Sequence, residues 1–220
     1  MTKHIFSAFL LLLLLAFSAV GSATAPEPAN EALLQKYSSD AAIDQILCIR
    51  QREGYNTQVT LYQKDSEAKW QVILDCGAFG GRNGFGKERE GDEKVPVGDF
   101  GILTAFGIKD NPGTALPYLK LNEYHYCSGN PEYYNQIVDE REVVTAEEMC
   151  GEHLIECDPE YTYAIFYDYN IEHIVGKGSA LFIHCKGAKI YTAGCIALDE
   201  ADMVTLLRKI KKNARILIYP

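Results

Sequence analysis

The stretch Ile183–Leu198, IHCKGAKIYTAGCIAL, carries more structural and chemical information than any other part of this chain. It places His184 eleven residues before Cys195, the last residue of the run Thr192–Cys195 (TAGC). A thiol is a weak nucleophile until a base removes its proton, and imidazole titrates near neutrality. Gly194 would let a substrate carbonyl approach the backbone and leave N–H groups available to an oxyanion. The pattern therefore predicts acyl transfer by a cysteine nucleophile.

The same residue types also have a purely structural interpretation. The chain contains seven cysteines and five histidines, so several pairs at such spacings arise by chance. A buried thiol on a strand and a core histidine would explain this one. His153 is the reserve candidate for the base, whereas His125 and His173 are expected at the surface. No Cys-x-x-Cys or His-x-x-x-His pair supports a zinc site, so no metal is predicted.

Further motifs stand in a fixed order before and around this stretch. They are Gly81–Gly86 (GRNGFG), Glu90–Asp92 (EGD), Val95–Phe100 (VPVGDF), Tyr133–Gln136 (YYNQ), Glu152–Leu154 (EHL) and Gly178–His184 (GSALFIH). Together with Thr192–Cys195 they resemble the L,D-transpeptidase catalytic-domain family. The resemblance spans roughly Gln45 to Tyr219, so residues 45–220 are expected to form one catalytic domain. It implies a β-sandwich, with Cys195 as the nucleophile.

Two positions depart from the family pattern. Most members carry histidine where this chain has Ala193, and many carry arginine or asparagine where it has Ala197. Thr-Ala-Gly-Cys in place of Ser-His-Gly-Cys resembles a branch of the family. If the missing side chain normally holds a substrate carboxylate or backbone, this chain must hold it by other means.

The beginning of the chain has the composition of a secretory signal peptide. Lys3 opens a short basic region, Ile5–Val20 is almost wholly apolar, and Gly21–Ala25 supplies small residues for cleavage. The apolar run has 16 residues, fewer than the ~20 that a spanning helix needs. We expect a signal peptide at 1–23 and a linker at 24–44, with no membrane-spanning segment after cleavage. The mature protein is expected in the periplasm or in the cell wall or extracellular space.

Composition limits the remaining classes of function. About 195 residues after cleavage suit one domain with its own core. A formal net charge of −9 without a basic stripe argues against nucleic-acid binding. In an exported protein the six cysteines besides Cys195 allow 15 disulfide pairings, which sequence cannot decide. They are Cys48, Cys76, Cys127, Cys150, Cys157 and Cys185. A bridge is favoured among the third, fourth and fifth of these, and the oligomeric state stays open.

Hydrophobic periodicity predicts a mainly β fold. Short runs rich in β-branched and aromatic residues are expected as strands at 45–52, 57–62, 70–76, 100–106, 161–167, 180–185 and 216–219. One or two short helices are expected: one is convincing, near 199–212, and Glu31–Tyr37 could add one helical turn or two. Asp199 is its expected N-cap, and Met203, Leu206, Leu207 and Ile210 follow the spacing of a buried helix face. Residues 111–160 are expected to be irregular.

The function implied by the resemblance is acyl transfer on peptidoglycan stem peptides. Cys195 would form a thioester with release of terminal D-Ala, His184 would act as base and acid, and the Gly194 and Cys195 amides would hold the oxyanion. Thr192 would shape the turn. An amine would resolve the thioester in cross-linking, or water would do so in an L,D-carboxypeptidase. This chemistry needs no cofactor.

Other functional residues and functions are less well defined. Tyr134, Asn135 and His153 are weak candidates for substrate binding. Cys185 is expected to face the core if His184 faces the cleft, with a disulfide or a redox partnership with Cys195 as alternatives. A non-catalytic, secreted wall-binding module is the second class of function. A papain-like protease is disfavoured because its cysteine precedes its histidine.

Overall fold

The computed structural model describes residues 28–145 and 147–220. The expected signal peptide, 1–23, and residues 24–27 of the expected linker lie outside the described residues. The longer elements are the helices α1 (Pro28–Gln35) and α2 (Glu200–Lys209) and the strands β1 (Gln45–Gln51), β2 (Asn56–Lys64), β3 (Trp70–Phe79), β5 (Ile102–Gly107) and β13 (Arg215–Tyr219). The shorter strands are β4 (Gly98–Phe100), β6 (Tyr118–Lys120), β7 (His125–Ser128), β8 (Ile137–Asp139), β9 (Gly151–His153), β10 (Ala164–Tyr167), β11 (Phe182–Cys185) and β12 (Ile196–Leu198). Three single-turn 3₁₀ helices are η1 (Pro131–Tyr133), η2 (Leu154–Glu156) and η3 (Glu160–Thr162).

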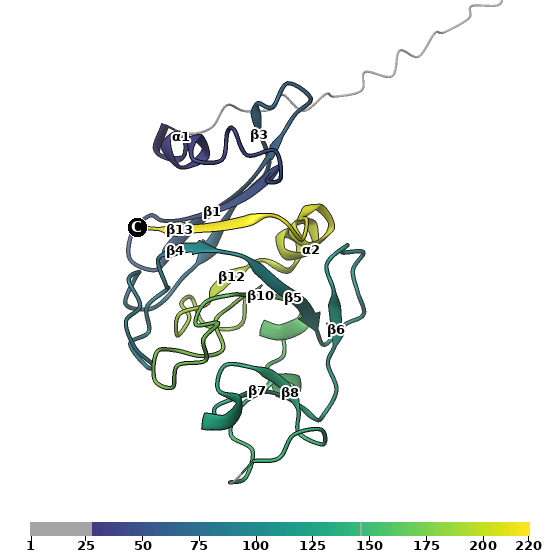
Figure 1. Ribbon diagram of the computed structural model, residues 1–220. Coiled ribbons are helices and arrows are strands. Elements are labelled where there is room, and N and C mark those ends of the chain that lie inside the picture. The colour runs from purple at the N-terminus through teal and green to yellow at the C-terminus, as the bar shows by residue number, and fades with distance from the viewer. Residues whose placement is uncertain (1–27, 146) are drawn as a thin grey trace, which may run out of the picture.

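Ten of the strands form one hydrogen-bonded sheet in the order β4-β13-β1-β2-β3-β12-β11-β10-β5-β6 (Figure 1). Most neighbours are antiparallel, but β1 and β13, β11 and β12, and β5 and β6 run parallel. The expectation of a mainly β fold with a C-terminal helix is confirmed.

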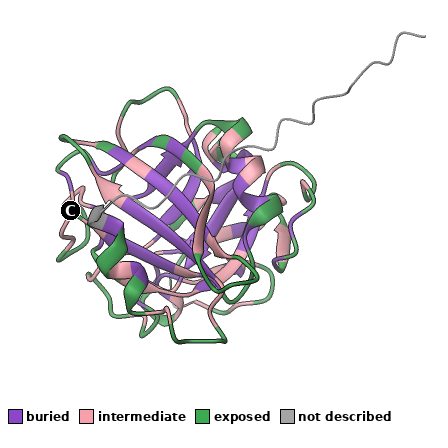
Figure 2. Cartoon of the chain, turned by 90° about the horizontal axis from the view of Figure 1, so that it is seen from above, coloured by how far each residue is buried: buried purple, intermediate pink, exposed green. Residues whose placement is uncertain are grey.

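The two halves of the sheet pack against each other around one core. Leu47 and Val59 from one half share this core with Ile165 and Phe182 from the other. The Phe100 ring on β4 lies 5.4 Å from the Tyr167 ring on β10, centroid to centroid. Figure 2 shows the central strands buried and the connecting loops exposed. Because both faces of β10 are covered, all four of its residues are buried, and it lacks the alternation of a half-exposed strand.

The strand expected at 100–106 is broken at Gly101. Its N–H donates to Asp168 Oδ1 at 2.7 Å, which separates β4 from β5 and lets the chain pass from one half of the sheet to the other. The strand expected at 161–167 also begins later, at Ala164, because the preceding residues form η3. In both places a local hydrogen bond or turn overrides the apolar pattern.

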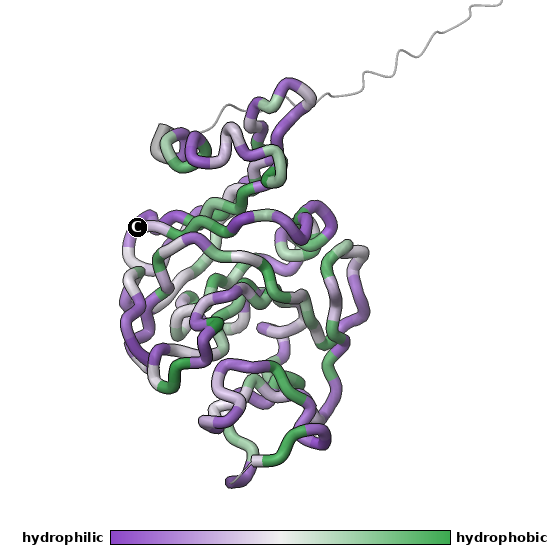
Figure 3. Tube along the Cα trace, viewed as in Figure 1, coloured by the Kyte–Doolittle hydropathy of each residue, from purple (hydrophilic) through white to green (hydrophobic). Residues whose placement is uncertain are grey.

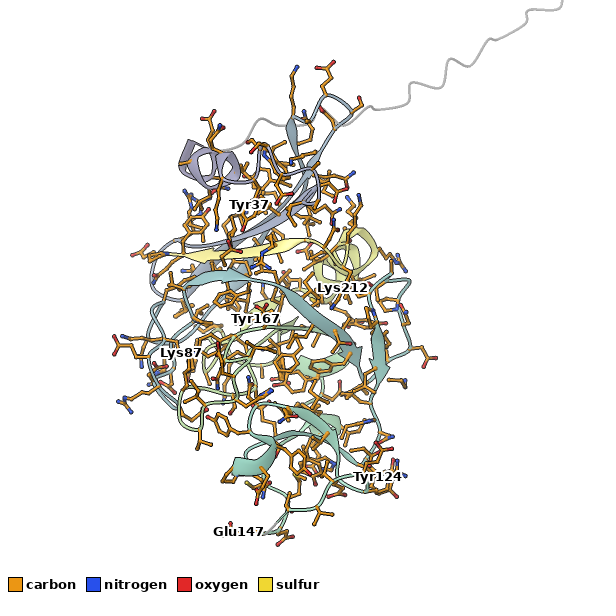
Figure 4. The ribbon with its side chains drawn as sticks, viewed as in Figure 1. Tyr37, Lys87, Tyr124, Glu147, Tyr167 and Lys212 are labelled. Atoms are coloured by element: carbon orange, nitrogen blue, oxygen red, sulfur yellow. The ribbon has the colours of Figure 1, made fainter. Side chains whose placement is uncertain are left out.

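Helix α1 covers the outer face of the first half of the sheet. Leu34 packs with Ile46, Tyr62 and Leu217 in a second apolar cluster. Tyr37, which follows the helix, lies between it and the sheet (Figure 4), and its hydroxyl bonds to Asp99. The described part of the segment expected as a linker therefore includes a packed helix. The helical turns expected at Glu31–Tyr37 are present, but the helix begins earlier, at Pro28, and ends at Gln35.

Helix α2 packs its apolar face on the core, as its sequence predicts. Met203, Leu206 and Leu207 are buried, and Figure 3 shows hydrophobic residues along the strands and within the helix. Asp199 occupies the N-cap position, as expected, but its side chain makes no capping hydrogen bond. Its Oδ2 accepts a bond from Lys186 Nζ at 2.9 Å.

The region 111–160 contains a second, three-stranded sheet in the order β8-β7-β9. The sequence gives no sign of these strands because each has only three or four residues. In Figure 1 they lie below the large sheet. No helix within the described residues is long and apolar enough to cross a membrane.

Candidate active site

The neighbouring parallel strands β11 and β12, in the interior of the sheet, bring His184 and Cys195 to one cavity. His184 is the third residue of β11 and pairs with Ala197 on β12. Cys195 lies immediately before β12, so the turn that carries the thiol is fixed by the strand next to the histidine. Parallel neighbours need a long connection, and the segment 186–195 provides it.

The turn before Cys195 is held by the hydroxyl of Thr192. That hydroxyl donates to the Cys195 carbonyl oxygen at 2.7 Å and accepts from the Gly194 N–H at 3.1 Å. The Gly194 amide is therefore engaged inside the turn, which leaves the Cys195 N–H as the amide expected to face an oxyanion. Gly194 has φ +140°, and a Cβ there would lie 2.7 Å from Lys94 O, so both conformation and space require glycine.

The glycine-rich loop between β3 and β4 supports this turn from the other side. Thr192 N–H donates to Gly80 O, and Arg82 N–H donates to Thr192 O, each at 2.9 Å. Within the loop Lys87 Nζ lies 2.8 Å from Asp92 Oδ1, and their side chains are only 1% and 9% exposed. Burial alone would raise the pKa of Asp92, but hydrogen bonds from Lys87 and from three backbone N–H groups hold that pKa well below its usual range. Figure 4 labels Lys87 on this loop.

Two cavities meet at Cys195. The larger, of about 420 Å³, also contains His184 and Tyr161, and the smaller, of about 170 Å³, contains Lys87 and Ser179. Within the described residues both are lined by Cys195, Ala193 and Glu152. Ala193, which lines both cavities, is exposed. A substrate could therefore approach the sulfur from two sides.

The Cys195 thiol is buried and hydrogen-bonded to the backbone. Its Sγ lies 3.2 Å from Ala180 O, to which it donates, and accepts from Phe182 N–H at 3.3 Å. Burial, followed by the nearby Glu152 carboxylate, raises the pKa of this thiol to about 12. In the free protein Cys195 is therefore a neutral thiol.

The His184 ring is oriented by a backbone carbonyl. Its Nδ1 lies 2.7 Å from Cys185 O, and because a carbonyl only accepts, Nδ1 carries the proton and Nε2 presents a lone pair. The Tyr161 ring packs edge-on against the imidazole, 5.5 Å between centroids. Burial lowers the pKa of His184, so the imidazole is neutral and able to accept a proton. Cys185 itself lies in the core, where its Sγ is 3.6 Å from Tyr163 O.

The three weak candidates for substrate binding lie in the shell around the cavities. Tyr134 donates to Glu90 Oε2 at 2.6 Å. Asn135 Oδ1 accepts from the N–H of Ala180 at 3.0 Å, so it positions the residue that binds the thiol. His153 stacks on Tyr126, and its Nε2 lies 2.7 Å from Glu123 O. None of the three lines either cavity at Cys195.

Sequence analysis did not select Glu152 or Lys87, although both line the smaller cavity. Glu152 stands next to the chosen His153 in the motif Glu152–Leu154, and on a strand adjacent side chains point to opposite faces. That motif was the available signal, and sequence analysis took His153 from it and not Glu152. Lys87 lies in the glycine-rich loop just before the motif Glu90–Asp92.

The cysteines other than Cys195 are also thiols. All seven lie in the described part of the chain and none forms a disulfide, so the bridge favoured among Cys127, Cys150 and Cys157 is absent from this structure. Among the described residues no group of three histidine, cysteine or acidic side chains is arranged to hold a metal ion.

Comparison with known proteins gives one family match. The model of the family described as YkuD, L,D-transpeptidase catalytic domain, matches residues 45–218. No curated protein matches the chain. Similar solved structures include a mutant L,D-transpeptidase of Enterococcus faecium, at 12% identity and TM-score 0.38, covering 80% of this chain and 50% of that one. Another is the helical cell shape determining protein Pgp2 of Campylobacter jejuni, at 15% identity and TM-score 0.41, covering 85% and 54%. The chain thus spans about half the length of the structures it matches.

Proposed function

The chain belongs to the L,D-transpeptidase catalytic domain family, and on that premise we propose that it transfers acyl groups of peptidoglycan stem peptides through a thioester on Cys195. The family membership supports a role in modifying peptidoglycan. The observation that carries the finer proposal is the larger cavity, which is lined by both the Cys195 thiol and the His184 imidazole. The orientation of His184 by Cys185 O supports its assignment as the base.

In the first half-reaction the thiol would attack the carbonyl at the L-configured centre of the stem. The S–H proton would leave Ala180 O and pass to His184 Nε2 as the S–C bond forms. The carbonyl oxygen would become an oxyanion facing the Cys195 N–H. His184 would then return the proton to the nitrogen of the departing D-Ala as the C–N bond breaks.

The protonation states of the free protein define the character of this step. The pKa of Cys195 is about 12, and the pKa of His184 is lowered by burial. A preformed thiolate–imidazolium pair is therefore disfavoured, and proton transfer has to accompany nucleophilic attack. This protects the thiol from alkylation and oxidation while no substrate is bound.

The thioester has two chemically distinct fates. An amine of a second stem would give a cross-link, and water would give a shortened stem by L,D-carboxypeptidase action. The two openings at Cys195 support the amine, because donor and acceptor could approach from different sides. We also propose that residues 1–23 direct export to the periplasm or the cell wall. Amino-terminal sequencing of the exported protein should then begin near residue 24, and an intact Met1 would contradict this.

Mass spectrometry of the protein mixed with disaccharide-tetrapeptide tests the catalytic proposal. The wild type should gain the mass of the donor minus D-Ala, whereas Cys195→Ala and His184→Ala should not. Cys150→Ala is the matched control, because it removes an exposed thiol outside both cavities. Dimeric muropeptide would indicate transpeptidation and free tripeptide carboxypeptidation. If the reduced wild type forms neither adduct nor product, the proposal is wrong and a non-catalytic wall-binding module becomes the better description.

A further inference from the structure

Glu152 is the carboxylate that both cavities at Cys195 share. It comes from β9, where it pairs with Cys127 on β7, so the small sheet delivers it to the active site. One carboxylate oxygen, Oε2, accepts a hydrogen bond from the Tyr161 hydroxyl. The Tyr161 ring in turn packs against His184. Glu152 is thus tied to the base through a single buried aromatic side chain and opens onto the space around the sulfur.

This carboxylate has no cationic partner within the described part of the chain. The residue is exposed to the cavity, yet protein atoms crowd its carboxyl group. That burial, together with the Glu90 charge, raises the pKa of Glu152 against the opposing hydrogen bond from Tyr161. Its own charge contributes to the raised pKa of Cys195. In the free protein the Glu152 charge therefore works against ionisation of the Cys195 thiol.

We propose that Glu152 binds the ammonium form of the acceptor amine and takes its first proton, so that the amine can attack the Cys195 thioester. The inference rests on the proposed thioester mechanism and assigns the acceptor as a primary amine that arrives protonated. Its chemical class is an alkylammonium group, such as the side chain of a diamino acid. Such a group has an unperturbed pKa of about 10.4 and is almost wholly protonated at neutral pH.

The protons and electrons of this step balance without a cofactor. The ammonium gives one proton to Glu152 and becomes a neutral amine, and its lone pair forms the C–N bond at the thioester carbonyl. The second N–H proton passes to His184 Nε2. The C–S bond then breaks, its electron pair returns to the Cys195 sulfur, and that sulfur takes the proton from His184. Glu152 finally releases its proton to solvent.

Water attacks the same thioester by a shorter route. It is already neutral and needs to lose only one proton, which His184 accepts. Removing Glu152 should therefore slow aminolysis and spare both hydrolysis and thioester formation. The titratable and charged groups that line the two cavities with Glu152, besides Cys195 and His184, are Lys87, Glu90, Glu93, Cys127, Cys157, Glu160, Tyr161, Lys189 and Tyr191. Of the two cations among them, Lys87 is paired with Asp92, and Lys189 lines the larger cavity.

The test compares wild type with Glu152→Gln, which keeps the shape and an oxygen acceptor for Tyr161. Each protein is acylated with disaccharide-tetrapeptide, and the thioester is chased with Nα-acetyl-lysine in buffer. The ratio of amide to hydrolysis product at pH 7.5 should fall by about 10²-fold in the variant, the scale of one general base. It should recover as the pH approaches 10, where solution supplies neutral amine. Glu156→Gln is the matched control, because Glu156 is 74% exposed and lies outside both cavities.

Each outcome separates this inference from the proposed function. An unchanged ratio in Glu152→Gln, or a fall that does not recover at high pH, would overturn the role of Glu152 while leaving the thioester intact. A wild type that forms the thioester but yields only hydrolysis product would overturn it as well. A wild type that forms no thioester would overturn the proposed function itself. The urea midpoint of Glu152→Gln, compared with that of Glu156→Gln, shows whether the variant is folded.

Discussion

Replacing Gly194 with alanine should destabilise the protein more than a glycine replacement at an open position. A non-glycine residue in this backbone region costs about 1–3 kcal/mol. The new methyl group would lie 2.7 Å from Lys94 O and 3.0 Å from Leu181 Cδ2, and relieving overpacking costs about 1–3 kcal/mol more. The expected loss in the free energy of unfolding is therefore about 2–6 kcal/mol. At a urea m-value of about 2 kcal/mol/M, the midpoint should fall by about 1–3 M.

Gly176→Ala provides the matched control. Gly176 also has a positive φ, +81°, but nothing lies within 4 Å of a Cβ placed there. Its replacement should cost only the backbone strain, about 1–2 kcal/mol. Urea unfolding followed by tryptophan fluorescence measures both variants. If the two midpoints fall equally, the close approach of Gly194 to Lys94 is not a constraint, and the account of the turn that holds Cys195 is wrong.

Three further predictions concern the residues around that turn. Thr192→Val removes the hydroxyl that bonds to Cys195 O and Gly194 N–H, so the free energy of unfolding should fall by about 1–3 kcal/mol. Thr192→Ser keeps the hydroxyl and should restore the stability. A valine variant as stable as the wild type would contradict these hydrogen bonds. The rate of Cys195 alkylation by iodoacetamide should rise about tenfold per pH unit between about pH 7 and 10, because the pKa of the thiol is about 12. Peptide mass spectrometry measures this rate. A plateau in the rate near pH 9 would disprove the raised pKa. Asp92→Asn leaves the buried Lys87 unpaired and should cost about 3–5 kcal/mol. Because the pKa of Asp92 is lowered in the folded state, its stabilisation is fully present above the unfolded pKa and is lost only as the pH falls through the lowered folded pKa. The difference between the wild-type and variant unfolding free energies should therefore shrink progressively as the pH falls below about 4. A difference that stays constant there would argue against the ion pair.

The long strands and α2 were predictable because the pattern of their buried side chains is set by residues that are close together in the sequence. Ile46 and Leu47 are adjacent and face different apolar clusters, which explains the continuous apolar run there. Met203 and Leu207 repeat at helical spacing and are both buried. Cys195 and His184 were accessible to sequence analysis for a different reason, because their chemistry and spacing form a motif within one β–loop–β unit.

The rest depended on contacts between residues far apart in the chain. Glu152 reaches the cavity only because β9 pairs with β7. In that pairing Glu152 lies opposite Cys127, which is 25 residues earlier in the chain. Strands of three residues are too short for a periodic pattern. Likewise, the Gly194 N–H is held by a hydrogen bond to the Thr192 side chain. Residue type alone does not indicate whether a threonine forms such a bond to the backbone of its own turn.

The position of β13 has a kinetic consequence. This strand, the last of the chain, lies inside the sheet between β4 and β1, with Leu47 opposite Ile216. The first strand of the large sheet is therefore completed by residues made about 170 positions later. Pairings of such sequence separation slow folding, because the loop must close before the contacts stabilise it. During synthesis β1 and β2 emerge early with one edge unpaired, and until β13 arrives that edge is open to other strands, including those of neighbouring chains.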